Sequence, residues 1–196
     1  MAFETVKKNL EARGFSVRVF HTGGEAAEYL NRVIDGASVG FGGSVTLQAL
    51  GLYNLLSEHN EVRWHWINGP EERRNAMGAE VYLTSANALA ETGEIINIDG
   101  AGNRVAATMF GPRRCFFVIG QNKLAPDFDA ALWRARNIAG PKNAQRLKVK
   151  TPCAAAGDRC YDCNSPERIC RGLSVLWRPM TGMKTEVLLI EEDLGL

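Results

Sequence analysis

A glycine-rich loop with two hydroxyl side chains stands between an expected strand and an expected helix. It runs over residues 40–46 and holds Gly40, Gly42, Gly43, Ser44 and Thr46. Glycine lets the backbone approach a ligand closely, and the first N–H groups of a helix lack partners and lie at the positive end of its dipole. This pattern predicts a site for a phosphate or carboxylate group. The alternative is a tight strand-to-helix turn with Ser44 as the N-cap.

Polar side chains surround a short apolar run at residues 94–98. Glu91 precedes a Thr-Gly turn before the run, whereas Asp99, Asn103 and Arg104 follow it in a loop with two glycines. A carboxylate near the open edge of a sheet can act as a base or a nucleophile, so Glu91 and Asp99 are the catalytic candidates. Arg104 can bind a carboxylate or phosphate with two parallel hydrogen bonds, with Asn103 beside it. In the alternative interpretation, Asn, Asp and Gly only shape turns.

Four of the five cysteines lie close together near the end of the sequence. Cys153, Cys160, Cys163 and Cys170 are separated by six, two and six residues. Four thiolates can bind zinc or a [4Fe–4S] cluster, and thiols stay reduced in the cytoplasm. Free thiols and a disulfide are the alternatives. Cys115 opens an apolar run and is expected in the core.

Helical and strand-like segments alternate along the first 140 residues. We expect helices at 3–12, 25–34, 46–56, 71–77 and 127–138, and strands at 15–20, 38–41, 62–67, 80–84, 94–98, 115–119 and 186–190. This order predicts an α/β fold with a mostly parallel twisted sheet covered by helices on both faces. Ligands bind beyond the carboxyl ends of such strands, which places the loops after residues 41, 84, 98 and 119 at the site. Lys123 follows the last of these and would add positive charge there.

The composition narrows the class of protein. The chain has 196 residues, 45% of them hydrophobic and 23% charged, with a formal net charge of +1. We expect a single domain over residues 1–196 with a Cys-rich excursion at about residues 151–172. The near-neutral charge argues against a nucleic-acid partner, and no run approaches the roughly 18 apolar residues of a membrane span. The first residues do not resemble a secretory signal, so a cytoplasmic location is expected, and no flavin or NAD fingerprint is present.

Two tryptophans flank His65 on the expected strand at 62–67. Trp64 and Trp66 would face the same side, where they would form part of the core or of a subunit interface. A stacking wall for a substrate is the alternative. An exposed pair of this kind makes a homodimer one of the assemblies to consider.

Taken together, the motifs resemble the lactate-utilization (LUD) domain family. The matching segments are residues 40–46, 91–106, 111–114 and 120–123, and the resemblance extends from about Phe3 to Leu196. It implies a fold like that of ribose-5-phosphate isomerase, glucosamine-6-phosphate deaminase and the coenzyme A transferases. It also implies a role in oxidising L-lactate to pyruvate together with iron–sulfur partner proteins. By analogy, residues 40–46 would hold an anionic group and Glu91 would resemble the nucleophile of the transferases.

The motifs and the resemblance together indicate three alternative functions. The first is an enzyme or oxidoreductase subunit of lactate utilization that binds a small carboxylate or phosphate. The second is a non-catalytic assembly or electron-relay module that uses a metal site on the four cysteines. The third is a phospho-sugar or coenzyme A dependent isomerase or transferase.

Overall fold

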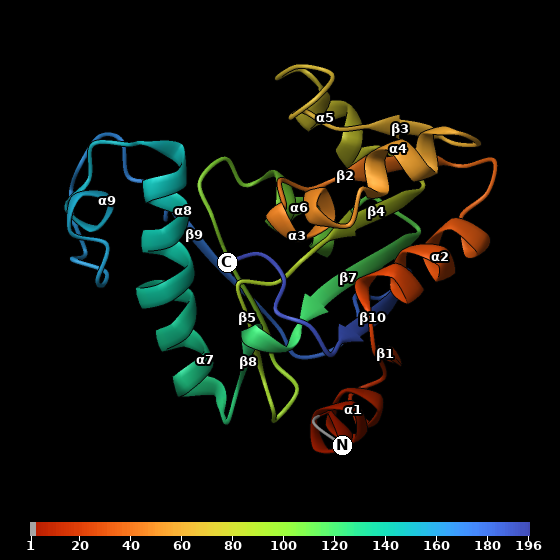
Figure 1. Cartoon of the computed structure of the whole chain (residues 1–196), viewed down its shortest axis with the longest axis horizontal. Coiled ribbons are helices and arrows are strands. Elements are labelled where there is room, and N and C mark those ends of the chain that lie inside the picture. Colours follow the sequence, from red (N-terminus) through yellow and green to blue (C-terminus); the bar gives the residue numbers. More distant parts are fainter. Residues whose placement is uncertain (1–2) are drawn as a thin grey trace.

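The computed structural model describes residues 3–196 and contains a central sheet of six parallel strands (Figure 1). The strand order is β1-β10-β7-β4-β2-β3, and every neighbouring pair is parallel. These strands are β1 (Ser16–Phe20), β2 (Ser38–Phe41), β3 (Glu61–Arg63), β4 (Val81–Thr84), β7 (Arg114–Gly120) and β10 (Lys184–Ile190). The predicted α/β fold with a mostly parallel sheet is confirmed.

The central strands are apolar on both faces because helices cover both. Successive side chains of a strand point to opposite faces, so Phe116 and Phe117 of β7 enter different core clusters. One cluster lies beneath α1 (Glu4–Ala12), α5 (Glu72–Met77) and α6 (Asn103–Met109). The other lies beneath α2 (Gly23–Val33), α3 (Val45–Ala49) and α4 (Leu52–Ser57). Cys115 is fully buried in the first cluster, as expected.

A second, smaller sheet stands beside the first. Its order is β8-β5-β6-β9, formed by β8 (Leu124–Ala125), β5 (Ala88–Ala90), β6 (Ile95–Asp99) and β9 (Gly172–Leu176). The strand predicted at 94–98 is β6, and it pairs antiparallel with β5 and β9 instead of joining the parallel sheet. The sheet packs against α7 (Phe128–Arg134), which continues through the π-helical turn η2 (Ala135–Ala139) into α8 (Gly140–Leu147).

Two predicted elements differ from the observed ones. The helix expected at 46–56 is divided into α3 and α4 at Gly51, whose φ of +63° favours glycine. The strand expected at 62–67 is β3, which ends at Arg63, so Trp64 and Trp66 lie in the turn that follows. Within residues 3–196, no helix is both long and apolar enough to cross a membrane.

The Cys-rich part of the chain leaves the sheets and returns to them. A short helix, α9 (Pro152–Ala156), follows α8, and residues 157–171 form neither helix nor strand. The chain then enters β9 of the smaller sheet, a strand that the sequence did not predict, before it reaches β10. Figure 1 shows this part at one end of the molecule, beside α8.

Candidate functional site

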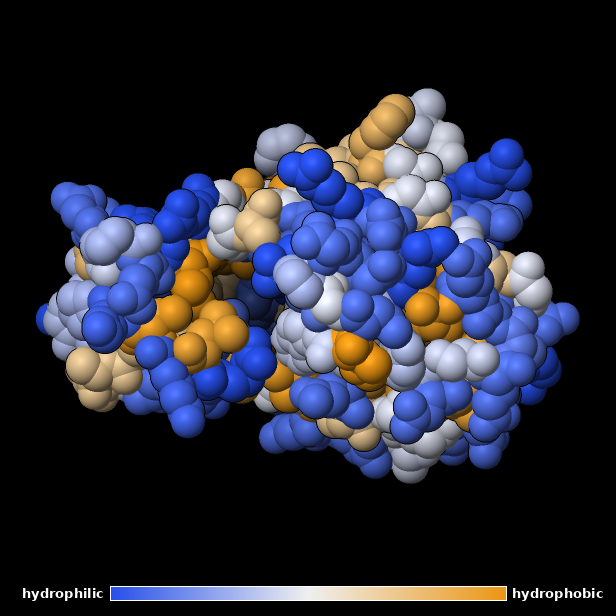
Figure 2. Space-filling view, turned by 90° about the horizontal axis from the view of Figure 1, so that it is seen from above, coloured by the Kyte–Doolittle hydropathy of each residue, from blue (hydrophilic) through white to orange (hydrophobic). Residues whose placement is uncertain are grey.

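A cavity of about 430 Å³ lies beyond the carboxyl ends of β2, β4 and β7, which are neighbours in the central sheet. The walls come from the loops after these strands, from the segment 98–104, from α8 and from residues 167–171. Figure 2 shows a hollow between the end of the molecule that carries α8 and the rest of it, with hydrophilic residues at its floor. The site therefore lies where parallel α/β sheets bind ligands.

The glycine-rich loop supplies one wall, and its members have different tasks. A Cβ at Gly42 would lie 2.9 Å from Thr84 Oγ1 and 3.0 Å from Arg104 Cγ, so glycine leaves room for the arginine stem. Ser44 caps α3 by accepting a hydrogen bond from Leu47 N, which matches the turn interpretation of this residue.

The two outer glycines of the loop pack against different neighbours. Gly43 lines the cavity, and a Cβ there would lie 3.2 Å from the Trp66 ring. Gly40 lies within β2, outside the cavity lining, where a Cβ would lie 2.1 Å from the carbonyl oxygen of Ala76 in α5. Gly40 therefore serves the packing of α5 on the sheet.

Lys123 lines the cavity from the end of η1 (Gln121–Lys123), directly after β7. Its residue is only 3% exposed, and Nζ donates to Thr46 Oγ1 at 2.8 Å and to Ser85 Oγ at 2.7 Å. Burial, then the nearby guanidinium groups of Arg134 and Arg104, lower the pKa of Lys123 to about 7. Within residues 3–196, Lys123 pairs with no carboxylate.

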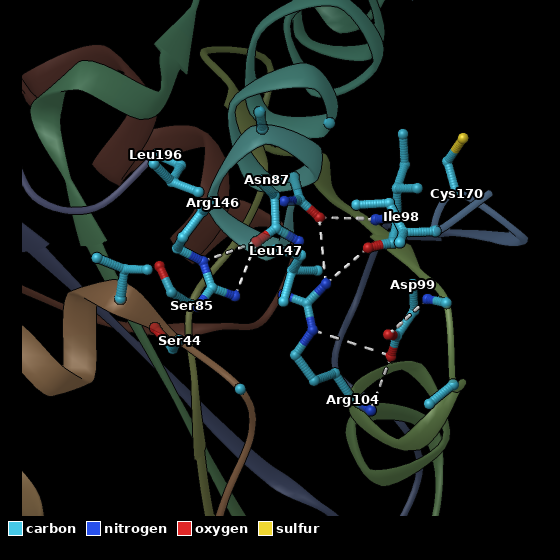
Figure 3. A pocket seen from close by; sticks show the side chains of 18 of the residues that line it. Ser44, Ser85, Asn87, Ile98, Asp99, Arg104, Arg146, Leu147, Cys170 and Leu196 are labelled. Atoms are coloured by element: carbon cyan, nitrogen blue, oxygen red, sulfur yellow. Dashed lines mark hydrogen bonds and ion pairs between the residues drawn. The ribbon is translucent and has the colours of Figure 1, made fainter. Parts of the chain in front are cut away.

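Arg104 and Asp99 form a second polar group on the opposite wall (Figure 3). Asp99 accepts from the backbone N–H groups of Gly100 at 2.8 Å, Arg104 at 2.9 Å and Val105 at 3.3 Å, so it fixes the first turn of α6. The Arg104 guanidinium donates to the carbonyl of Ile98 at 2.6 Å, and its Nε lies 3.9 Å from Asp99 Oδ2. These contacts hold Arg104 in the cavity in one orientation.

Positive charge dominates the cavity lining. Two carboxylates, Asp99 and Glu167, lie in the lining, and both accept hydrogen bonds from backbone N–H groups. The cationic side chains of the lining are Arg73, Arg104, Lys123, Arg146, Arg168 and Arg171. Because cations outnumber carboxylates, the site is suited to an anion.

Three of the predicted site residues, Gly40, Gly42 and Glu91, are absent from the cavity lining. Ser85 and Asn87 precede β5 and line the cavity, whereas Glu91 follows β5 and lies at the other end of that strand. Its N–H donates to the carbonyl of Ala125 and its carbonyl accepts from Asn9 Nδ2 in α1. The remaining predicted residues Ser44, Thr46, Asp99, Asn103, Arg104 and Lys123 all line the cavity.

Several lining residues were not singled out from the sequence. Asn87 is the most connected of them: its Oδ1 accepts from Ile98 N at 2.8 Å, and its carbonyl accepts from Arg134 at 2.5 Å. Arg146 of α8 lies over the Trp66 ring, 4.8 Å from its centroid. Ser85 and Asn87 follow a predicted strand end, which was the available signal, whereas Arg146 lies in α8, for which the sequence contains no such signal.

The Trp64 and Trp66 rings stack 5.2 Å apart, and Trp64 is only 2% exposed. Trp64 packs into the core, as the first interpretation predicted, whereas Trp66 lines the cavity, so the two rings do not form an exposed pair. His65 also lines the cavity, and burial together with Arg73 lowers its pKa.

The four cysteines near the end of the sequence have suitable chemistry but are not gathered into a ligand set. All four are free and partly exposed. In the part of the chain that the structure describes, no three His, Cys, Asp or Glu side chains are placed to hold a metal ion. Cys170 lines the cavity, whereas Cys160 Sγ lies 3.9 Å from a guanidinium nitrogen of Arg136. We therefore derive no chemical step through a metal on these residues.

The chain matches a protein-family model. The sequence model of the LUD domain matches residues 3–190. The chain belongs to the LUD domain family. A search of curated proteins found no match for this LUD domain.

A solved structure shares the fold of this LUD domain. It is the crystal structure of a DUF162 family protein from Deinococcus radiodurans at 1.70 Å resolution. The two chains align with a TM-score of 0.56 and 12% sequence identity, over 96% of this chain and 95% of the other. The six-stranded parallel sheet with flanking helices is consistent with the isomerase, deaminase and transferase fold that the sequence resemblance implied.

Proposed function

We propose that this LUD domain binds the carboxylate of a small hydroxy or oxo acid in the cavity, as a component of L-lactate oxidation to pyruvate. The observation that carries the proposal is the buried Lys123 opposite Arg104 in one cavity, without a carboxylate partner for the lysine within residues 3–196. A buried cation without a counter-charge is costly, and an anionic ligand would offset that cost.

The two cations would contribute differently to binding. The Arg104 guanidinium presents donors in a planar fork that suits a carboxylate, and Asp99 holds the start of its helix. Thr46 and Ser85 present hydroxyl groups beside Lys123, which suit the hydroxyl or carbonyl oxygen of the same ligand. A molecule with a carboxylate next to an oxygen-bearing carbon matches this pair of binding groups.

Oxidation of lactate to pyruvate releases two electrons and two protons. In the proposal, an iron–sulfur partner protein takes up the electrons, while the residues of this chain bind and orient the acid. Phosphate remains the other anion that the cavity chemistry would accept, since Arg, Lys, Ser and Thr side chains bind it as readily.

The test is a binding titration of the purified chain with L-lactate, pyruvate and lactamide. Calorimetry and thermal unfolding measure the binding. Lactamide has the shape of lactate without the charge. We expect both acids to bind and lactamide to fail. Arg104→Ala should weaken binding about 10- to 100-fold, because a hydrogen bond to a charged group contributes roughly 1.5–3 kcal/mol.

The matched control is Arg18→Ala, whose side chain on β1 is 55% exposed and does not line the cavity. Its affinity should equal that of the wild-type chain. Equal binding of lactate and lactamide, or an unchanged affinity in Arg104→Ala, would refute the proposal. Binding of inorganic phosphate with exclusion of both acids would favour the phospho-sugar alternative.

A second candidate concerns the four cysteines. Cys170 lines the cavity, and the Arg168 side chain donates to the carbonyls of Cys163 and Cys170, so the Cys-rich segment forms part of the site. We propose on the cysteine spacing that the segment binds zinc or an iron–sulfur cluster after rearrangement, as part of an electron-relay module.

Elemental analysis and absorption spectra of anaerobically purified protein test this second candidate. Iron with broad visible absorption would identify a cluster, and zinc alone would identify a structural site. A chain in which all four cysteines are replaced by serine is the control, since it should lose the metal. Absence of both metals from the wild-type chain would refute the candidate.

A further inference from the structure

The burial and the hydrogen-bond partners of Lys123 are not required for anion binding alone. The residue is 3% exposed, and both hydrogen bonds of its amine are made to hydroxyl groups, Thr46 and Ser85. A lysine that serves as a permanent cation is usually solvated or paired with a carboxylate. Here the amine faces the cavity from its interior wall.

The charges around Lys123 favour a neutral amine. Arg134 is 8% exposed, and its guanidinium is fixed by the carbonyls of Asn122 and Asn87 at 2.9 and 2.5 Å. Arg104 lines the same cavity, and its positive charge also acts on Lys123. Burial and these two cations bring the lysine pKa to about 7, so about half of the amine is unprotonated at neutral pH. A desolvated lysine beside other cations is a recognised way to activate this nucleophile.

The ligand of the proposed function contains an electrophilic carbon atom. A 2-oxo acid such as pyruvate carries a carbonyl carbon directly beside its carboxylate. With the carboxylate on Arg104, the carbonyl would lie toward Lys123 and the two hydroxyl groups. This step rests on the proposed function, because it requires the acid to bind in this cavity.

We infer that Lys123 Nζ forms an imine with the carbonyl carbon of a 2-oxo acid bound in the cavity. The lone pair of the neutral amine attacks the carbonyl carbon, and the carbonyl oxygen becomes a hydroxyl group. The bond from that carbon to the oxygen then breaks, and the oxygen leaves as water with the two amine protons. The amine and the oxo acid thus give an imine and water, with no change of oxidation state and no co-reactant.

The hydroxyl groups of Thr46 and Ser85 are placed to assist the proton transfers. Each lies within hydrogen-bond distance of Nζ, and Thr46 also donates to the carbonyl of Leu194 at 3.3 Å. Formation of water from the carbinolamine needs a proton delivered to its oxygen and one removed from its nitrogen. Two hydroxyl groups beside the reacting nitrogen can pass these protons.

The experiment traps the imine in the full chain at pH 7. The protein is incubated with pyruvate and cyanoborohydride, and its intact mass and peptide map are measured. We expect one adduct per chain, on Lys123, with a mass increase equal to pyruvic acid less one oxygen atom. At this pH the unprotonated fraction of Lys123 exceeds that of an ordinary lysine about a thousandfold, so surface lysines should remain largely unmodified.

Two controls separate this inference from simple anion binding. L-Lactate has no carbonyl group, so it should give no adduct and should slow trapping by competition in the wild-type chain. Lys123→Arg retains a cation but cannot form an imine, whereas Lys142→Arg changes an exposed lysine of α8. We expect the first variant to lose the adduct and the second to behave as wild type.

Three results would overturn the inference. Pyruvate that binds without an adduct refutes it and leaves the proposed function intact. Adducts scattered over surface lysines, with Lys123 unmodified, refute it as well. If neither acid binds, the proposed function fails and the imine fails with it. The wild-type competition by lactate decides the matter even where Lys123→Arg does not fold.

Discussion

Replacement of Lys123 by methionine should change how the stability of the protein depends on pH. The folded-state pKa of Lys123 is about 7, and that of an unfolded lysine is about 10.4. Between these values the unfolded chain binds more protons than the folded one, so stability rises with pH. Integrated from pH 7 to pH 9, this one group adds about 2 kcal/mol to the free energy of unfolding. Lys123→Met removes that increment.

The assay is urea unfolding of wild-type and variant chains at both pH values. Lost hydrogen bonds to Thr46 and Ser85 change the stability of the variant similarly at the two pH values, so they cancel when the differences are compared. The free energy of unfolding of the variant minus that of wild type should therefore be about 2 kcal/mol lower at pH 9 than at pH 7.

The matched control is Lys142→Met, because this lysine is exposed on α8 and its solvation changes little on folding. Its difference from wild type should be the same at both pH values. A Lys123→Met difference that stays constant within about 0.5 kcal/mol from pH 7 to pH 9 would refute the claim that this amine is neutralised by burial.

Two further substitutions test how the site is built. Gly40→Ala should destabilise the chain by about 3 kcal/mol, because its Cβ would lie 2.1 Å from the Ala76 carbonyl oxygen, and urea unfolding would measure it. An unfolding midpoint equal to wild type would contradict this packing. Asp99→Asn should cost about 1–2 kcal/mol and weaken lactate binding, because one carboxylate oxygen that accepts backbone N–H groups is lost and Arg104 is less fixed. Calorimetry with an affinity unchanged from wild type would show that Asp99 does not position Arg104.

The parallel sheet could be predicted from the sequence because its strands are buried on both faces. Unbroken apolar runs such as residues 115–119 differ clearly from the spacing of an amphipathic helix. This run corresponds to β7. The strand at 94–98 was recognised equally well, but its pattern does not say which sheet it enters. The small strand β5 was missed because Ala88–Ala90 is short and rich in alanine, which strands disfavour.

That missed strand explains why Glu91 lies outside the cavity lining. Without β5, residues 85–91 belong to the loop after residue 84, which was expected at the site. The strand carries the chain away from the cavity, so Ser85 and Glu91 lie at its opposite ends. Asp99 and Arg104 were predicted correctly as cavity residues because both follow a strand end. Arg146 was missed because only tertiary packing brings α8 over the site.

Lys123 and Arg104, the two cavity cations of the proposed binding site, follow strands of different sheets. Lys123 follows β7 of the six-stranded parallel sheet, and Arg104 lies at the start of α6, shortly after β6 of the smaller sheet. The separation between them is fixed where the sheets meet, in the core cluster that joins Leu89 and Ile95 to Phe117. A change of side-chain volume at Leu89, remote from any ligand, would therefore alter the span between amine and guanidinium. Under the proposed function, selection for a longer or shorter acid can act on the interior of this protein while the residues of the binding site stay the same.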